Sequence, residues 1–348
     1  MKITSLLSLL FLVFTISVHA ESKVENFNLK MSPTRYISFE LVRAKNSKLP
    51  TLLFMPGVNR GLLASDEALE KLAAQGFGVV TMNFSTQPFS VSALPKNATP
   101  DFRTTTYKLD DLNTEVIALS NELKTHFDVK TIIPVSISFS SAVSSTLQTF
   151  PLIIDAVPMT ASAAVNPDLE AYITYLHSTE IFNPVFGPAI TRSILDQSYA
   201  SKWRTQVDSI VDEFKLNADR KSDMVEGYTV FSRASEGFVW DLTKTAKETR
   251  RVFIFARDDS PSLLKSQLQL FLKVLDTTPN ALAFVVNDSG HVVSNDQPEA
   301  YVNILTYLLT KDFKAVSGIF DVKPGSDKNK IHTGAAAKKY IQDILDTL

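Results

Sequence analysis

The stretch TIIPVSISFSSAVSSTL, residues 131–147, decides the fold of this chain. Its first five residues are rich in β-branched side chains and predict a short buried strand. After Ser138 the apolar residues follow helical spacing, which predicts a strand that turns sharply into a helix. A serine at such a turn projects its hydroxyl above a parallel sheet, where the first amides of the helix point toward the reacting group. Ser138 is therefore a candidate nucleophile.

The turn itself, residues 136–140, reads SISFS, whereas the pattern typical of nucleophile turns is G-x-S-x-G. Glycine suits that pattern because strand and helix approach closely and the nucleophile has a strained backbone. Serine is the next-smallest polar residue, so Ser136 and Ser140 are compatible with the turn but weaken the signal. Two alternatives stay open here. Ser138 also fits an ordinary helix N-cap, and Ser141 is a second candidate nucleophile, although it lies further into the helix.

Buried strands and amphipathic helices alternate along most of the chain. The predicted strands cover 27–31, 36–44, 51–55, 77–82, 131–135, 152–157, 251–256 and 281–286, and the predicted helices beside the one after Ser138 cover 62–75, 110–127, 263–275, 297–309 and 335–348. The polar and apolar alternation in 36–44 is typical of a half-exposed edge strand. Strands that alternate with helices predict an α/β fold, with a mostly parallel, doubly wound sheet and helices on both faces.

One long segment breaks this alternation. Residues 160–247 contain no good buried strand, are rich in aromatic side chains and hold both tryptophans. We therefore predict a helical insertion at 160–247 within a core made of residues 21–159 and 248–312. Residues 313–348 predict a polar linker, punctuated by proline and glycine, that leads into a short C-terminal helix.

The N-terminal residues MKITSLLSLLFLVFTISVHA have the composition of a secretory signal peptide. A lysine precedes an apolar run of about 13 residues, and a small-x-small cleavage site ends at Ala20. The run is too short to span a bilayer comfortably. We expect cleavage after Ala20 and a mature chain that is secreted or periplasmic, with no stable membrane span.

Composition narrows the range of partners. The chain has no cysteine, so its stability depends on core burial. The net charge of −2 provides no basic patch, so we expect no nucleic-acid partner. His126, His177 and His332 lack partners at metal-ligand spacing, so no metal site is predicted and no cofactor is required.

Titratable side chains follow two later strands. Asp258 and Asp259 come directly after the strand 251–256, and His291 follows the strand 281–286. A nucleophilic serine needs a base within hydrogen-bonding reach and an acid that orients the base. Because the carboxyl ends of parallel strands meet at one edge of a sheet, we expect these side chains to lie near Ser138. Alone, the aspartates resemble an acidic helix start and His291 a surface histidine.

The chain order of serine, acid and histidine resembles that of the α/β-hydrolase fold. The resemblance covers about residues 27–309 and is strongest at the C-terminal end. There, Gly290-His291 is followed by Gln297-Pro298-Glu299 and a last helix, similar to the G-H-x(5–7)-P-E-x-V ending of that family.

The resemblance assigns roles to particular residues. It implies a triad of Ser138, Asp259 and His291, with Asp258 as the alternative acid. The loop Pro56-Gly57-Val58 matches the family's oxyanion loop, although a proline replaces its usual histidine. Backbone amides of Val58 and Phe139 would then form the oxyanion hole. The insertion would be a cap over the pocket.

These expectations together predict a serine hydrolase that cleaves carboxylic esters with an apolar or lipid-like acyl group, through an acyl-enzyme and without a cofactor. Two alternatives stay open. One is a serine peptidase on the same fold, which would need an acidic anchor for a substrate amine; Glu170, Glu180, Asp208 and Asp212 are the candidates. The other is a non-catalytic binding protein with this fold, which the absent elbow glycines favour.

Overall fold

The computed structural model describes residues 23–46, 48–57, 66–160, 212–213, 215–235, 238–241, 249–278, 280–310, 317–326 and 329–348. The expected signal peptide, Val58 and most of the expected cap lie outside these ranges. The strands are β1 (Glu25–Ser32), β2 (Arg35–Val42), β3 (Thr51–Met55), β4 (Gly78–Asn83), β5 (Ile132–Ile137), β6 (Leu152–Ala156), β7 (Arg250–Ala256), β8 (Leu282–Val286), β9 (Gly318–Val322) and β10 (Lys330–His332).

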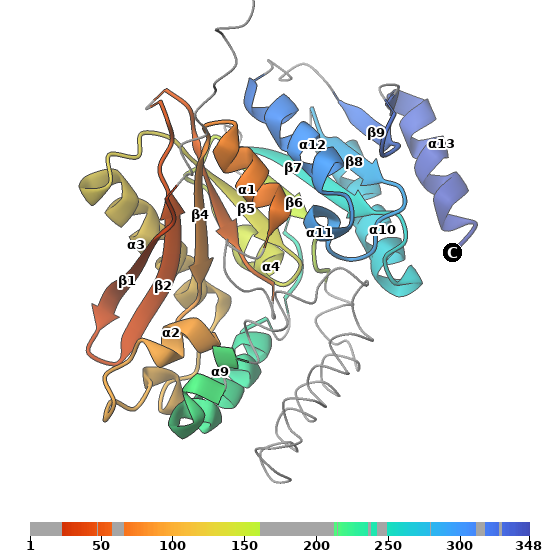
Figure 1. Cartoon of the computed structure of the whole chain (residues 1–348). Coiled ribbons are helices and arrows are strands. Elements are labelled where there is room, and N and C mark those ends of the chain that lie inside the picture. The colour runs from red at the N-terminus through yellow and green to blue at the C-terminus, as the bar shows by residue number, and fades with distance from the viewer. Residues whose placement is uncertain are drawn as a thin grey trace, which may run out of the picture.

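These strands form one sheet in the order β1-β2-β4-β3-β5-β6-β7-β8-β9-β10 (Figure 1). The strands from β4 to β9 in this order run parallel to one another. The remaining strands are antiparallel: β1 and β2 form one edge of the sheet, where β2 pairs with β4, and β10 forms the other edge, where it pairs with β9. The mostly parallel sheet predicted from sequence is therefore confirmed. Because β2 lies between β1 and β4, the prediction that 36–44 is an edge strand was wrong: β1 occupies that edge.

The helices are α1 (Glu67–Ala74), α2 (Pro88–Ser92), α3 (Leu109–His126), α4 (Ser140–Ser144), α9 (Lys221–Arg233), α10 (Pro261–Thr277), α11 (Val293–Asp296), α12 (Pro298–Thr310) and α13 (Gly334–Leu345), with short 3₁₀ turns at Asp101–Arg103 and Ala218–Arg220. Local signals explain several boundaries. The Asp66 carboxylate accepts from the amides of Ala68 and Leu69 and so caps α1. Pro261 begins α10, where its missing N–H costs nothing.

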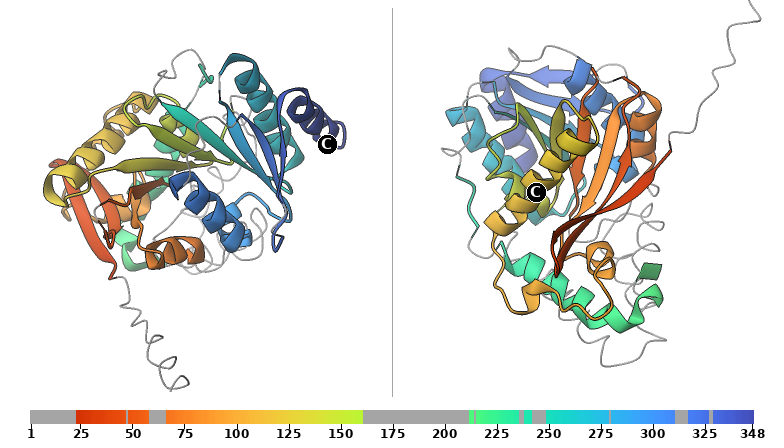
Figure 2. Two further views of the ribbon diagram at one scale, coloured as in Figure 1. Left: turned by 90° about the horizontal axis from the view of Figure 1, so that it is seen from above. Right: turned by 90° about the vertical axis from the view of Figure 1, so that its left-hand side faces the viewer.

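Helices cover both faces of the twisted sheet (Figure 2). The apolar sides of α1, α11 and α12 pack on one face, against alternate strand residues such as Val135 and Ile254. The opposite face carries α3, α4, α10 and α13, packed on residues such as Ile153 and Phe253. The central strands are buried on both faces, which is why their sequences are almost continuously apolar.

The C-terminal segment differs from the prediction. Within the expected linker of 313–348, β9 pairs with β8 along its whole length, and β10 turns back antiparallel to β9. Apolar residues of α13 then pack with those of α10. The segment therefore extends the sheet and its cover. Its short strands were missed because the polar, proline- and glycine-containing residues around them are typical of a linker.

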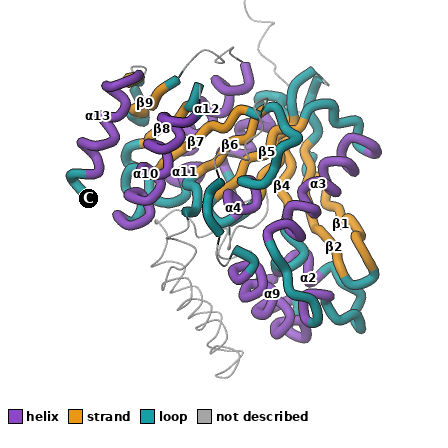
Figure 3. Tube along the Cα trace, turned by 180° about the vertical axis from the view of Figure 1, so that it is seen from behind, coloured by secondary structure: helices purple, strands orange, loops and turns teal. Residues whose placement is uncertain are grey.

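One helix of the expected cap is described. Buried side chains of α9, among them Tyr228 and Phe231, join the same apolar cluster as α3. Figure 3 shows α9 beside α2, at the end of the sheet where the parallel strands finish.

Candidate active site

Ser138 occupies the sharp turn between β5 and α4. Its φ is 56°, in the left-handed region that non-glycine residues rarely adopt. The amide of Ser138 donates to the Ala156 carbonyl, at 3.0 Å, which ties the turn to the end of the neighbouring strand β6. Such local strain is typical of functional residues that the surrounding structure holds in place.

The two serines that replace the glycines of the turn are both fully buried and both hydrogen-bonded. Ser136 Oγ donates to Oδ1 of Asp155 on β6, at 2.7 Å. Ser140 Oγ donates to the carbonyl of Met55 at 2.7 Å and accepts from the amide of Ile137 at 2.8 Å. The elbow therefore accommodates serine by giving each hydroxyl a partner, and Ser140 links the turn to the end of β3.

His291 and Asp259 extend a hydrogen-bond chain from Ser138. Nε2 of His291 lies 2.9 Å from Ser138 Oγ, and its Nδ1 lies 2.9 Å from Asp259 Oδ2. The sequence-predicted acid Asp259 is buried at this position, whereas the alternative acid Asp258 is exposed and its backbone amide donates to the Ser289 carbonyl. The structure thus brings Ser138, His291 and Asp259 together from the ends of three strands.

Nearby groups fix the acid and the histidine loop. The second oxygen of Asp259 accepts from the Ser260 amide at 2.8 Å. The Gly290 amide, one residue before His291, donates to Asp296 Oδ2 at 2.8 Å. Ser294 Oγ donates to Asp66, the cap of α1, at 3.0 Å. Sequence reasoning missed both acids: Asp296 acts within the histidine loop, six residues from Gly290, whereas the role of Asp66 depends on a contact between distant segments.

The electrostatics of His291 favour its charged form. Burial lowers the pKa of His291, but the charge of Asp259 and its hydrogen bond raise the pKa more, so the net pKa lies above the ordinary value of 6.5. An imidazole in this setting is a competent proton acceptor once neutral, and its cation is stabilised after it has taken a proton.

Gly57 lies directly beside the nucleophile. A Cβ built on Gly57 would lie 3.3 Å from Ser138 Cβ and 3.8 Å from its Oγ. Glycine is therefore the residue that lets the loop after β3 approach the elbow so closely. Of the two expected oxyanion donors, Phe139 begins the turn into α4 and is buried, and Val58 lies outside the described residues.

Buried aromatic side chains pack against the elbow residue Phe139. The rings of Phe139 and Phe231 on α9 have centroids 4.3 Å apart, and the ring of Phe84 packs on Phe231 at 5.2 Å. Trp240 Nε1 donates to the Met159 carbonyl at 2.7 Å. The described part of the insertion is thus in contact with the candidate site.

The remaining candidates from the sequence are Ser141 and four acidic residues. Ser141 Oγ donates to the Ser138 carbonyl at 2.6 Å and accepts from the Met159 amide at 2.7 Å, so it supports the turn. Of the acidic residues considered as anchors for a peptide amine, Asp212 pairs with Lys215 at 3.0 Å, and the other three lie outside the described residues.

A metal site or a membrane-spanning helix would point to a metal ion or a membrane as a partner. Across the residues that the structure describes, no group of three or more histidine, cysteine or acidic side chains is placed to hold a metal ion. Within the same residues, no helix combines the length and the apolar character needed to cross a bilayer.

Comparison with known proteins identifies the fold. No family model matches the chain, and no curated protein matches it. Several solved structures are similar to the chain. A probable hydrolytic enzyme from Pseudomonas aeruginosa PAO1 has a TM-score of 0.59 and 16% identity, over 83% of this chain and 95% of that chain. The carboxylesterase CesB of Bacillus subtilis has a TM-score of 0.55 and 15% identity, over 83% and 93%.

An α/β-hydrolase enzyme from a deep-sea metagenome library of the Medee basin is similar to the same extent, with a TM-score of 0.55 and 12% identity over 83% of this chain and 98% of that chain. At such identities the likeness concerns the fold. Together with the sheet order and the strand-turn-helix at Ser138, it shows that this chain has the α/β-hydrolase fold that the sequence resembles.

Proposed function

We propose that this protein is a serine hydrolase that cleaves carboxylic esters. The observation that carries the proposal is the continuous hydrogen-bond chain from Asp259 through His291 to Ser138, which ends at a serine held in a strained strand-helix turn. A nucleophile, a base and an orienting acid in this arrangement are the parts that acyl transfer requires.

The reaction follows from the roles of these groups. His291 Nε2 takes the proton of Ser138 as Oγ attacks the ester carbonyl, and Asp259 holds the proton on Nδ1 and stabilises the resulting imidazolium. Backbone amides of Phe139 and Val58 would donate to the oxyanion. The imidazolium then gives its proton to the leaving alcohol. Water, activated by the neutral His291, hydrolyses the acyl-enzyme and releases the acid.

An ester with an apolar or lipid-like acyl group suits the surroundings of Ser138. Phe84, Phe139 and Phe231 pack together in the apolar core directly behind the elbow, and sites that bind apolar groups are lined mostly by such side chains. The names of the structural neighbours, which include carboxylesterases and esterases, support an ester substrate. We further propose that the mature protein begins after Ala20 and acts in the periplasm or outside the cell.

The test is labelling of purified mature protein with a fluorophosphonate probe, which reacts with activated serines. Wild type should label, and Ser138→Ala should not. The matched control is Ser145→Ala, which removes a buried hydroxyl at the end of α4 that donates to the Ala142 carbonyl at 2.6 Å and should leave labelling intact. A panel of esters with increasing acyl length, beside peptide amides, then separates esterase from peptidase. A folded wild type that does not label would contradict the proposal and favour the non-catalytic binding protein.

The pH dependence of ester hydrolysis follows from the raised pKa of His291. The base must be neutral to accept a proton, so kcat/KM should rise with pH and level off through an apparent pKa above 6.5. The measurement is initial rate against pH at low substrate concentration. A profile that is already flat below pH 6 would show that His291 is not the base.

A further inference from the structure

Gln87 connects the loop beside the nucleophile to the loop after β4. Its side chain is 1% exposed. Nε2 donates to the Gly57 carbonyl at 2.9 Å, and Oε1 accepts from the Phe84 amide at 2.9 Å. The Gln87 backbone amide also donates to the Phe84 carbonyl at 2.8 Å. Both ends of the side-chain amide are therefore used, one on each loop.

The bond to Gly57 acts next to the reacting group. The Gly57 carbonyl and the amide bonded to its carbon form one planar unit, so a bond to the carbonyl oxygen restricts the rotation of that unit. Gly57 lies so close to Ser138 that a Cβ built on it would be in van der Waals contact with the Ser138 side chain. Donors for an oxyanion act only when they are held in place before the reaction.

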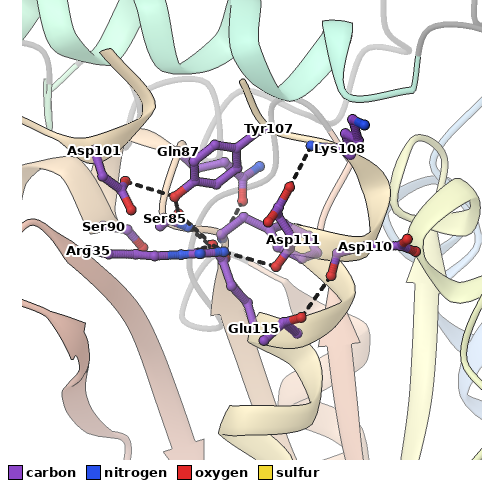
Figure 4. Close-up of polar contacts among 12 residues, drawn as sticks. Arg35, Ser85, Gln87, Ser90, Asp101, Tyr107, Lys108, Asp110, Asp111 and Glu115 are labelled. Carbon is purple, nitrogen blue, oxygen red and sulfur yellow. Dashed lines mark hydrogen bonds and ion pairs between the residues drawn. The ribbon is translucent and has the colours of Figure 1, made fainter. Parts of the chain in front are cut away.

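A buried ion pair anchors the loop that carries Gln87. Oε2 of Glu115 accepts from the Ser85 amide at 2.9 Å, and its Oε1 accepts from Ser85 Oγ at 2.5 Å. Arg35 donates to the same Oε1 through Nε at 2.9 Å and Nη2 at 2.7 Å. The Arg35 guanidinium lies 4.7 Å from the Tyr107 ring centroid. Figure 4 shows these residues gathered around Ser85, with Gln87 close by.

The other side of the same loop is covered by α9. A Cβ on Gly227 would lie 2.0 Å from the Thr86 carbonyl oxygen, so the backbone of α9 rests directly on the residue before Gln87. Only glycine permits this approach. The loop is thus fixed on one side by the Arg35–Glu115 pair and on the other by α9. The backbone that carries Gln87 is therefore rigid, and the Gln87 side chain extends from it to Gly57.

We propose that Gln87 is a positioning residue for the backbone at the end of β3, holding the Gly57 carbonyl, and with it the approach of Gly57 to Ser138, in the arrangement that stabilises the oxyanion formed at Ser138. The inference rests on the proposed function. Many buried polar residues serve stability alone. Gln87 differs from them, because its substitution should weaken stabilisation of the transition state rather than binding of the substrate.

The test compares two substitutions with a matched control. Gln87→Met keeps the length of the side chain and removes both hydrogen bonds. Gln87→Glu keeps an acceptor for Phe84 but places an oxygen against the Gly57 carbonyl. The control, Ser90→Ala, removes a buried hydroxyl in α2 that accepts from the Ser38 amide at 2.9 Å and donates to the Asn83 carbonyl at 2.7 Å, away from Gly57.

We expect kcat to fall about 10- to 100-fold in both Gln87 variants, with KM nearly unchanged, because a misplacement of about 1 Å costs up to about 100-fold. A trifluoromethyl ketone that forms a tetrahedral adduct with Ser138 should lose affinity in the same proportion as kcat/KM falls. Ser90→Ala should keep wild-type kcat. Unchanged kcat in Gln87→Met, an equal loss in Ser90→Ala, or unchanged ketone affinity would overturn the inference.

Hydrogen exchange separates this inference from the proposed function. A peptide that covers residues 50–66 should exchange faster in Gln87→Met than in wild type or Ser90→Ala, whether or not the protein hydrolyses esters. Equal exchange in all three proteins would overturn the positioning role. Absence of fluorophosphonate labelling in wild type would instead overturn the proposed hydrolase activity, and the exchange result would still decide whether Gln87 anchors the loop.

Discussion

His291→Ala is expected to lower kcat for ester hydrolysis by about 10⁶-fold, and Asp259→Asn by about 10⁴-fold. His291 is the group on the hydrogen-bond chain that is placed to take the proton of Ser138, since Nε2 lies 2.9 Å from Oγ. Asn at 259 keeps the shape of the acid but cannot hold a proton on Nδ1 as a carboxylate does. The base itself remains, so kcat should fall less than in His291→Ala. The measurement is steady-state kinetics on an activated ester.

The chain supplies its own control for the acid. Asp258 is adjacent to Asp259 but exposed, so Asp258→Asn changes the same charge without touching His291 and should retain wild-type kcat. Asp259→Asn should also lower the apparent pKa of the pH profile, because the carboxylate is what raises the pKa of His291. If Asp258→Asn and Asp259→Asn lost activity equally, the assignment of Asp259 as the orienting acid would be wrong.

Much of this arrangement was predictable because the relevant signals are local. Ser138, Asp259 and His291 each follow a short run of apolar residues, and parallel strands deliver their C-terminal ends to one edge. The family resemblance implies Asp259 as the acid, with Asp258 as the alternative, and the contact between Asp259 and His291 agrees with that choice. Their catalytic roles stay a proposal until the variants are measured.

Other features depend on contacts between distant segments, which no local pattern encodes. Gln87 is a single polar residue in the short connection between β4 and α2, and its significance appears only when Gly57 is brought beside it. The strand β9 consists of five residues in polar surroundings, and it forms because β8 offers an edge to pair with. Likewise, whether serine could replace glycine at the elbow depended on partners for Ser136 and Ser140 that lie on β6 and β3.

Asp155, the hydrogen-bond partner of Ser136, forms the ion pair whose loss should have the largest effect on stability. Arg251→Met should lower the free energy of unfolding by about 3 to 5 kcal/mol, because it leaves the Asp155 carboxylate buried without a counter-charge. Nη1 of Arg251 lies 2.9 Å from Asp155 Oδ2, and both side chains are almost fully buried. The other carboxylate oxygen accepts from Ser136 and Ser144, on either side of the elbow.

Chemical denaturation of wild type, Arg251→Met and the double variant Arg251→Met with Asp155→Asn measures this effect. The double variant removes the charge but keeps an acceptor for the two serines, so it should recover most of the lost stability. The exposed pair of Lys339 and Asp343 is the control, and Lys339→Met should cost less than about 0.5 kcal/mol. A loss below about 1 kcal/mol in Arg251→Met would contradict the role of Arg251 as the required partner of the buried Asp155.

The Arg251–Asp155 pair follows from the sequence of the elbow itself. A turn with glycines needs no polar partner beneath it, whereas the buried hydroxyl of Ser136 requires an acceptor. Ser144, in α4, donates to the same carboxylate oxygen and also has the Ser141 carbonyl within reach. A carboxylate satisfies both hydroxyls at once, and a buried carboxylate in turn requires a cation. Arg251 supplies the cation, and its guanidinium also lies 5.4 Å from the ring centroid of Trp240, at the end of the insertion. Rescue by the uncharged double variant would therefore show that the serine-rich elbow and this ion pair form one structural unit.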